Sequence, residues 1–595
     1  MIFKTGMRLL FRLVFWLAVV LAAFPLEALD RDAFTFTRYS LRASLRPAEH
    51  EFEAEGTIEL RNDSNSPQKE VPLQISSSLA WKEIQLEGHQ PVAYITQSYT
   101  SDIDHTGALE EAIVTLPEAL APGATLKLEV SYGGEIRRSS GRLARAGAPE
   151  SIIQQSDWDE IDERFGAVRG LGYVTWYPVS IEAVSLGDGT AMFDAIARWK
   201  QRHAQTTIHL ALSLNFDAAH PAPLSLVTNG RAQAGAAGQP AEFSSSQGGR
   251  VTAEAVEADF QAASTPVFAF GEFLKLEGIA LTVYHAPDQV DAARAYADSA
   301  EEAERALADW FGPLKNRPRV VALRDPNAAA FESENLMLAP LRPISNQARQ
   351  LLLARVLVHG SIGSPRKWIS EGLARFGQAL LLERQAGRAA ANEFLAQVLP
   401  PLIRIERDAG PAAEAAKKAE RDSLIHTNDE LLYTGKGAYV WWMLRDIAGD
   451  TALTKAIAAY RPEQDRDAAY VQQLIEAQST PRRNWQAFFD SWVYHDYGLP
   501  DLRVAATNAR QTAENTYVVS VTVENLTRVW AEVQVVVKSA KGDARLARLQ
   551  VPGNAKSTTR IAFQGVPVMA EINDGSVPEL DLTNNQMPVL PPGQP

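Results

Sequence analysis

The chain has 595 residues, which at roughly 100 to 200 residues per domain predicts three or four domains. Hydrophobic residues make up 46% of it and charged residues 22%, a globular composition that argues against disorder. No basic block offsets the formal charge of −14, which argues against nucleic acid as the main partner, and the lack of cysteine excludes disulfides and thiolate metal sites.

The first segment, 1–29, has the pattern of a signal peptide. Three basic residues precede an apolar run, 13–24, which falls short of the roughly 20 residues that a membrane-spanning helix needs. Cleavage near Ala28 is expected, but Leu26 suits a cleavage site poorly, so an uncleaved N-terminal anchor is the alternative. The chain is therefore predicted to be exported to the periplasm or the extracellular space, and to contact a membrane only through this segment.

The next segment, 30–273, has a hydrophobic period near two. Runs such as HEFEAEGTIELRN and TTIHLALSLNF alternate apolar and polar residues and are separated by Pro, Gly, Asn and Asp. This pattern is typical of antiparallel sheets with one buried face. It predicts an N-terminal β-sandwich or saddle-shaped sheet domain.

The segment 274–499 changes from strands to helices. GIALTVYHAP and PRVVALRD are predicted strands, whereas ARQLLLARVLVHGS and GKGAYVWWMLRDIAG have apolar residues at helical spacing. A small mixed sheet followed by a helical half is an α+β domain. The last segment, 500–595, returns to a period of two in runs such as NTYVVSVTVENLT and WAEVQVVVKSA. Its size and strand spacing predict an immunoglobulin-like β-sandwich.

The stretch that bears most on chemistry is VLVHGSIGSPRKWISEGLARF, residues 356–376. Zinc hydrolases of the H-E-x-x-H type place two histidines at i and i+4 on a helix, with the glutamate as general base. Here His359 is followed by Gly360, which has no carboxylate, and position i+4 is Gly363, which has no imidazole. Because glycine and proline disfavour helix, the two glycines and Pro365 also predict that the helix ends here.

Three motifs carry a family resemblance. WISEGLARF, 368–376, is similar to the pattern W-x-x-E-G-x-A-x-F/Y, FESENLMLAP, 331–340, to a G-A-M-E-N strand, and LLYTGKGAYV, 431–440, to a Y-x-K-G-A helix start. Together they resemble the membrane alanyl aminopeptidase family of zinc metallopeptidases, gluzincins with a thermolysin-like domain. Weaker similarity in the family order covers the chain from about residue 35 onward. The interval from His359 to Glu371 is about eleven residues shorter than the family's, roughly three helical turns, so the chain is identified as a degenerate member.

The resemblance implies roles for residues of a peptide-binding cleft. Glu334 and Asn335 fall on the Glu-Asn pair of the family motif, where the glutamate holds the substrate's free α-amino group, and they are the predicted substrate-binding residues. His359 and Glu371 fall where metal ligands are expected and are the predicted remnants of a zinc site. These positions assign no catalytic residue.

One tyrosine is the candidate for a remnant catalytic group. The resemblance implies that a tyrosine before Lys436 stabilises the transition state in family members. Counting back from Lys436 places Thr434 at that position, and Tyr433 fits only if the turn bulges by one residue.

Each of these residues also has an interpretation that involves no ligand. His359 is then a packed or capping histidine at a helix end, and Glu371 is a carboxylate favoured by the dipole at a helix start. Glu334 is then an acid at a strand edge, and Tyr433 belongs to the core or to a wall. The metal interpretation needs a third ligand from elsewhere, for which His426 is the candidate.

The sequence therefore predicts a catalytically inactive pseudo-peptidase, which binds peptides or serves as a scaffold for an extracytoplasmic protein, without a cofactor. The alternative is an active zinc metallo-aminopeptidase with a non-standard metal site, which would require Zn. A third interpretation is purely structural, with the partner surface on the outer sandwiches.

Overall fold

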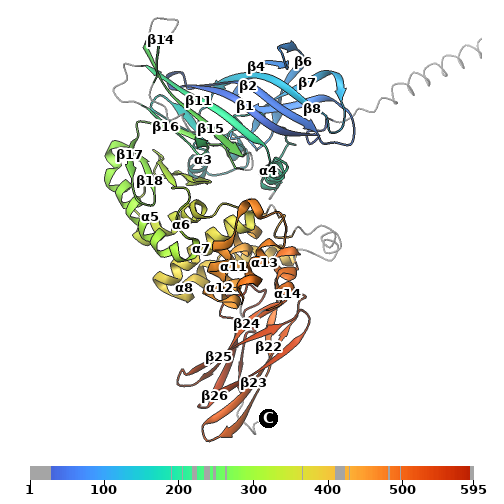
Figure 1. The fold of residues 1–595 in the computed structure, drawn as a ribbon, viewed down its shortest axis with the longest axis vertical. Helices are drawn as coiled ribbons and strands as arrows, with labels where there is room; N and C mark the ends of the chain where they lie inside the picture. The colour runs from blue at the N-terminus through green and yellow to red at the C-terminus, as the bar shows by residue number, and fades with distance from the viewer. Residues whose placement is uncertain are drawn as a thin grey trace, which may run out of the picture. The chain divides into compact units, whose positions relative to one another are not determined.

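The computed structural model describes residues 29–589, except 189–190, 204, 218–223, 233–240, 245–249, 262–263, 365, 409–422, 428, 480–482 and 496. Residues 1–28 of the predicted signal peptide lie outside the described residues, and so does Pro365. Within the described part of the chain, no helix is both long enough and apolar enough to cross a membrane. The protein is a multidomain, mixed α/β chain with several sheets (Figure 1).

The chain divides into two compact units. Unit 1 comprises the described residues of Met1–Ile153, Asp159–His220 and Gly230–Pro266. Unit 2 comprises those of Gln154–Trp158, Pro221–Asn229 and Val267–Pro595. The helical segment and the C-terminal strands thus belong to one unit.

Unit 1 is built mainly from a nine-stranded and a three-stranded sheet. The nine-stranded sheet has the order β13-β15-β11-β1-β2-β8-β4-β5, with β14 on β15, and the three-stranded sheet has the order β3-β7-β6. β1 runs parallel to β11 and antiparallel to β2. The strands are β1 (Phe34–Arg46), β2 (Glu51–Asn62), β3 (Gln68–Ser76), β4 (Leu79–Leu86), β5 (Gln90–Pro91), β6 (Ala93–Thr100), β7 (Ala108–Leu120), β8 (Thr125–Glu135), β11 (Thr207–Asp217), β13 (Arg231–Ala232), β14 (Ala241–Ser244) and β15 (Arg250–Gln261).

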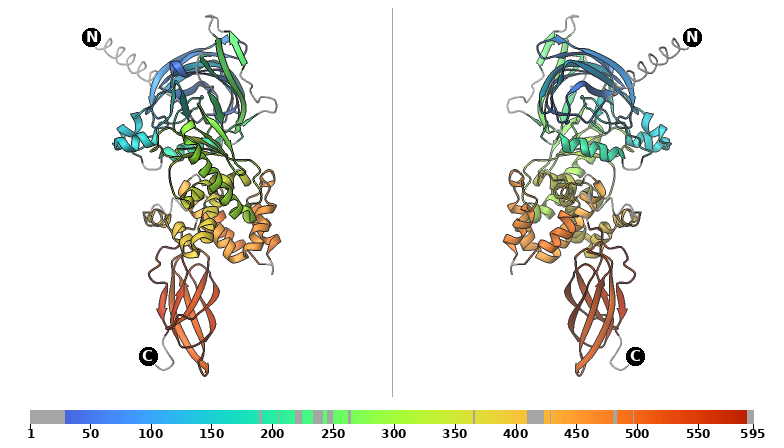
Figure 2. Two further views of the ribbon diagram at one scale, coloured as in Figure 1. Left: turned by 90° about the vertical axis from the view of Figure 1, so that its left-hand side faces the viewer. Right: turned by 90° about the vertical axis from the view of Figure 1, so that its right-hand side faces the viewer.

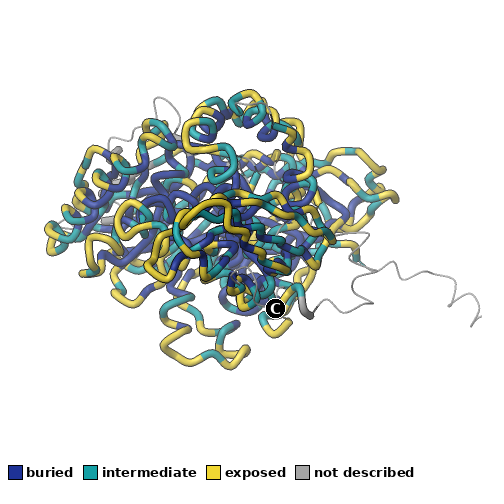
Figure 3. The backbone as a smooth tube through the Cα atoms, turned by 90° about the horizontal axis from the view of Figure 1, so that it is seen from below, coloured by how far each residue is buried: buried dark blue, intermediate teal, exposed yellow. Residues whose placement is uncertain are grey.

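The period-two pattern of the sequence explains these strands. Along β1, Tyr39, Leu41 and Leu45 are buried, whereas Arg42 between them is exposed. Because successive side chains of a strand point to opposite faces, this alternation places one face of the sheet on the core. Figure 3 colours the backbone by how far each residue is buried. Shorter elements complete this region of the sequence: α2 (Gly141–Arg145), α3 (Glu150–Ser156), β9 (Glu160–Asp162), β10 (Phe165–Val168) and α4 (Ala191–Arg202).

Unit 2 begins with the antiparallel pair β12 (Ser225–Thr228) and β16 (Phe268–Gly271) and a five-stranded sheet of order β17-β18-β19-β21-β20. Its three central strands run parallel and its two edge strands antiparallel. The strands are β17 (Leu274–Glu277), β18 (Thr282–His285), β19 (Arg319–Ala322), β20 (Phe331–Ser333) and β21 (Leu336–Ala339). This sheet places the short edge strand β20 beside β21.

The helices of unit 2 pack into one hydrophobic core. They are α5 (Val290–Phe311), α6 (Asn346–Ser361), α7 (Lys367–Ala386), α8 (Arg388–Ala396), α9 (Leu399–Asp408), a π-helical turn η3 (Leu431–Lys436), α11 (Gly437–Ala448), α12 (Asp450–Ala459), α13 (Tyr470–Gln478) and α14 (Gln486–Phe489). Helix α6 begins at a serine N-cap, where Ser345 Oγ accepts a hydrogen bond from the Ala348 amide at 3.2 Å. Helix α6 packs between α5 and α7.

The C-terminal part of unit 2 consists of two antiparallel sheets, of orders β22-β23-β26 and β25-β24-β27-β28 (Figures 1 and 2). Alternate valines of β23 and β24, such as Val521 and Val535, are buried in the same core. The strands are β22 (Leu502–Ala513), β23 (Thr516–Asn525), β24 (Ala531–Ser539), β25 (Ala544–Val551), β26 (Lys556–Gln564), β27 (Pro567–Ile572) and β28 (Gln586–Pro588).

Candidate functional site

Helix α6 brings two basic side chains to one face at its C-terminal end. Arg355 and His359 are four residues apart, a spacing that places them one turn apart on the same side of a helix. The helix ends at Ser361, and Ile362 has extended backbone angles while its amide still donates to Val358 O at 2.8 Å. Gly363 therefore lies beyond the helix, and the i,i+4 pair that α6 offers is Arg355 and His359.

Gly360 is required by the loop that packs against it. Its carbonyl oxygen accepts hydrogen bonds from the amides of Lys315 and Asn316, both at 3.0 Å. A Cβ atom at position 360 would lie 2.6 Å from the carbonyl oxygen of Asn316, closer than such atoms approach in proteins. A glutamate in the place of a general base does not fit here unless this loop moves.

Four charged side chains meet at the end of α6, and we call them the Arg355 cluster: Glu332, Arg355, His359 and Glu371. Glu332 comes from β20 and Glu371 from the first turns of α7. His359 Nδ1 lies 2.6 Å from Glu332 Oε1, and His359 Nε2 lies 3.6 Å from Glu371 Oε1. Arg355 Nη2 donates to Glu371 Oε2 at 2.8 Å, and Arg355 Nε lies 3.5 Å from Glu332 Oε2. Each carboxylate thus lies between a guanidinium and an imidazole.

The neighbouring carboxylates raise the pKa values of both basic groups of the Arg355 cluster. Burial alone would lower the pKa of His359, but the charges of Glu371 and Glu332 outweigh it and the pKa lies above the ordinary value. The same balance raises the pKa of Arg355. The pairing of the Arg355 guanidinium with these carboxylates offsets part of the cost of burying charge.

The cluster does not fit a zinc ion. A catalytic zinc site needs three protein ligands and an open position, and a guanidinium is not a ligand. Arg355 hydrogen-bonds the carboxylate of Glu371, and Glu332 accepts from His359 Nδ1. Among the described residues, no group of three or more His, Cys, Asp or Glu side chains is arranged to hold a metal ion. His426 is exposed, and no described hydrogen bond or ion pair joins it to the cluster.

A close crossing of two helices fixes the position of Glu371. A Cβ atom on Gly372 would lie 3.1 Å from the backbone of Gly437, so α7 and α11 approach each other at a pair of glycines. Trp441 Nε1 of α11 donates to the carbonyl oxygen of Trp368 in α7 at 3.2 Å, and the two indoles stack. The glycine after Glu371 therefore allows the close packing that holds this carboxylate in place.

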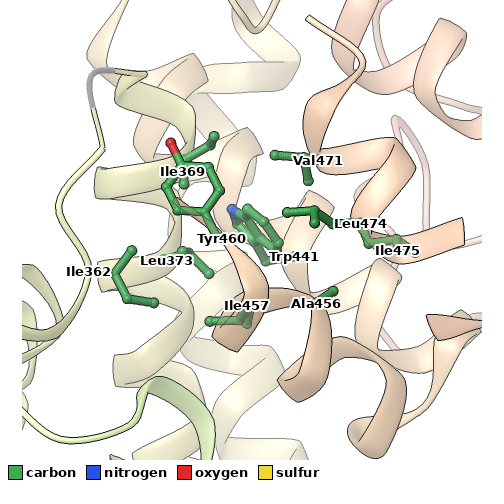
Figure 4. Close-up of a pocket in the computed structure, with 10 residues that line it drawn as sticks. All are labelled: Ile362, Ile369, Leu373, Trp441, Ala456, Ile457, Tyr460, Val471, Leu474 and Ile475. Atoms are coloured by element: carbon green, nitrogen blue, oxygen red, sulfur yellow. The ribbon is translucent and has the colours of Figure 1, made fainter. Parts of the chain in front are cut away.

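The other face of α7 is apolar. Ile369 and Leu373, two residues to either side of Glu371, line a small pocket with Trp441 and Tyr460 (Figure 4). The side chains that line it include no charged group. The polar chemistry of this part of α7 therefore lies on the face that bears Glu371.

The turn before Lys436, which would have to bulge for Tyr433 to match the family motif, is a π-helix. Residues Leu431–Lys436 form the π-helical turn η3, which holds one more residue than an α-helical turn. Thr434 is buried, and its hydroxyl has no hydrogen-bond partner among the described residues. Tyr433 is half-buried, and burial, together with the charges of Glu430 and Glu371, raises its pKa well above the ordinary value. Tyr433 is therefore a neutral phenol in the electrostatic field of Glu371.

The predicted substrate residues occupy a hairpin turn. Glu334 and Asn335 connect β20 to β21, and Glu334 is exposed with a positive φ of 53°. Asn335 accepts hydrogen bonds from Arg319, through its backbone oxygen at 2.8 Å and its side-chain oxygen at 3.2 Å. The side chain that reaches the cluster from this hairpin is Glu332, two residues before Glu334.

Sequence reasoning thus singled out His359 and Glu371 but missed Glu332 and Arg355. One signal was available for Arg355, which is the only charged residue in the otherwise apolar run LLLARVLV, 351–358. A lone charge on a buried helix predicts a partner, because buried charges are paired. No comparable signal marked Glu332.

Comparison with known proteins gives distant similarities. No protein-family model matches the chain, and no curated protein matches it. Among solved structures, an M1 zinc metallopeptidase from Deinococcus radiodurans is 16% identical with a TM-score of 0.41, over 75% of this chain and 90% of that one. A mutant of it bound to a Tyr-Ser-Ala substrate is 16% identical with a TM-score of 0.39, over 75% and 91%. A two-domain M1 zinc metallopeptidase mutant bound to L-arginine is 17% identical with a TM-score of 0.40, over 75% and 91%.

Proposed function

We propose that this chain is an exported, aminopeptidase-like protein without peptidase activity, which binds the free N-termini of peptides. The observation that carries the proposal is the ion pair between Arg355 and Glu371. It engages the carboxylate that the family resemblance assigns to the metal. The motifs around Glu334, Glu371 and Tyr433 support the family relationship.

The chemistry that peptide hydrolysis needs has no provider in the Arg355 cluster. A zinc-dependent hydrolysis requires a metal-bound water and a general base beside it. The residue after Arg355 is the buried Val356, and the residue after His359 is Gly360, so neither helix position offers a base. Loss of a general base alone costs about 10² to 10⁴ in rate. This loss supports the inactive form over an active zinc aminopeptidase.

Glu334 is the group that we assign to peptide binding. Its carboxylate is exposed on the β20–β21 turn, and no described hydrogen bond or ion pair involves it. An unpaired carboxylate attracts a free ammonium group through a charge-assisted hydrogen bond. Asn335 beside it is held by Arg319, which gives the turn a fixed backbone. The partner is then a peptide, or an extracytoplasmic protein that presents a free N-terminus.

Calorimetric titration with short peptides tests this assignment. A peptide with a free α-amino group is expected to bind at least about tenfold more tightly than its N-acetylated form, since a charge-assisted pair contributes roughly 1.5 kcal/mol or more. Glu334→Gln should remove the difference. Glu463→Gln is the matched control, because Glu463 is exposed and forms no described ion pair. Equal affinities for both peptides would refute amine recognition and leave only a structural role.

The absence of activity has its own test. The wild-type chain, equilibrated with zinc, is expected to release no product from aminoacyl amides above the rate without protein. Metal-dependent turnover would overturn the proposal.

A further inference from the structure

Arg355 occupies the position on α6 from which a metal ligand would act. A helix that binds zinc offers two histidines at i and i+4 and takes a third ligand from a neighbouring element. On α6 the i+4 position is His359, and the neighbouring element is α7 with Glu371, at 3.6 Å from His359 Nε2. The first position of this set is Arg355.

We propose that the guanidinium of Arg355 is the built-in cation of this site, so that the cluster assembles without a metal ion and excludes one. The guanidinium contacts both carboxylates, Glu371 at 2.8 Å and Glu332 at 3.5 Å. It thereby joins α7 and β20 to α6 as an ion held between two carboxylates would. This inference does not depend on peptide binding by Glu334.

The charges of the cluster support the proposal that Arg355 takes the place of a metal ion. Two buried carboxylates need positive charge nearby, because an unpaired buried charge is costly. Arg355 supplies a permanent positive charge that contacts both carboxylates. A metal entering the wild-type cluster would have to displace the guanidinium, which keeps its charge at any physiological pH.

His359 Nε2 is oriented as it would be in a metal-binding histidine. His359 Nε2 is buried and has no hydrogen-bond partner among the described residues, while Nδ1 is fixed by Glu332. A histidine whose second nitrogen is held by a carboxylate is oriented as metal-binding histidines are. The site therefore lacks one ligand and carries one cation in its place.

The test replaces that cation by a ligand. Arg355→His creates an i,i+4 histidine pair with Glu371 beside it, and is expected to retain about one zinc ion per chain after dialysis, against essentially none in the wild type. Zinc should also raise the melting temperature of the variant but not that of the wild type. Arg349→His is the matched control, since Arg349 lies on α6 but contacts Ser299 of α5 instead of the cluster.

A second variant covers the case in which Arg355→His does not fold. Arg355→Gln removes the charge and leaves His359 and Glu371 as donors to a metal ion, with Glu332 holding His359 Nδ1. Zinc is expected to raise its melting temperature by more than that of Arg349→His. Zinc retained by the wild type, or no zinc effect on any folded Arg355 variant, would overturn the proposal. Peptide titration is unaffected by either result, so peptide binding by Glu334 is tested separately from this inference.

Discussion

Two carboxylate sites of unit 2 differ in their partners. In the Arg355 cluster, Glu332 and Glu371 are paired with a guanidinium and an imidazole. In the C-terminal sheets, Glu579 is fully buried, and its described hydrogen-bond donors are all neutral. It accepts hydrogen bonds from the Leu502 amide at 3.1 Å, from Asn573 Nδ2 at 2.5 Å and from Asn585 Nδ2.

The two arrangements differ in which group has a shifted pKa. Burial raises the pKa of Glu579 to about 7, although the three N–H donors act against it. The cluster instead raises the pKa of its two bases, Arg355 and His359. Glu579 is therefore sensitive to pH near neutrality, whereas Glu332 and Glu371 depend on a cation. Charged pairs therefore join α6, α7 and β20 at the end of α6, whereas neutral donors hold Glu579 in the C-terminal sheets.

The largest expected effect comes from removing the guanidinium of the Arg355 cluster. Arg355→Met leaves Glu332 and Glu371 facing each other with only His359 between them. We expect a loss of about 3 to 4 kcal/mol in the free energy of unfolding, the lower part of the range for a broken buried pair, because Arg355 is 30% exposed. Urea unfolding measures this loss in the free energy of unfolding.

Two further variants show whether this loss comes from unpaired charge. Arg355→Met with Glu371→Gln should recover part of the stability, since it removes one of the stranded carboxylates. Arg305→Met breaks an exposed ion pair with Glu301 and should cost less than about 1 kcal/mol. A similar loss for Arg305→Met and Arg355→Met would show that the cluster is no more than a surface ion pair.

The second effect concerns Glu579, whose hydrogen-bond donors are neutral. Its pKa in the folded state, about 7, lies above the ordinary value of 4.5, so the folded chain binds more protons between these values. Its contribution to stability is fully present below pH 4.5 and is lost as the pH rises through about 7, by roughly 3 kcal/mol in all. Glu579→Gln should flatten this dependence in urea unfolding, whereas Glu514→Gln, at an exposed position, should keep it. The same slope in both variants would contradict the assignment.

The smallest effect sharpens the description of the end of α6. Gly360→Ala places a Cβ atom 2.6 Å from Asn316 O and should destabilise the fold by about 1 to 3 kcal/mol. Gly363→Ala is the matched control, because a Cβ there meets nothing within 4 Å, and it should be close to neutral. Thermal unfolding of the two variants compares them directly. Equal melting temperatures would mean that the loop does not exclude a side chain at position 360.

Local pattern was enough for some features of the fold and site. The period of two predicted sheets at both ends of the chain, because alternation follows from strand geometry alone. The end of α6 followed from its glycines. These features depend on neighbours along the chain.

The remaining features depend on contacts that sequence patterns do not encode. Glu332 meets His359 across 27 positions, through a strand whose register places Glu332 opposite Met337. The bond from Arg355 to Glu371 depends on how α6 and α7 cross. The reason for Gly360 lies in the backbone of Asn316, which no spacing of residues within α6 indicates. Tertiary packing thus decided which charged groups form the site.

The most direct test of the account is anomalous X-ray scattering at the zinc absorption edge from crystals of the wild-type chain soaked with zinc. We predict no anomalous peak beside His359 and Glu371, and a guanidinium of Arg355 that still contacts Glu371. A peak at about 2.0 to 2.2 Å from His359 Nε2 and a Glu371 oxygen, with Arg355 displaced, would contradict the account.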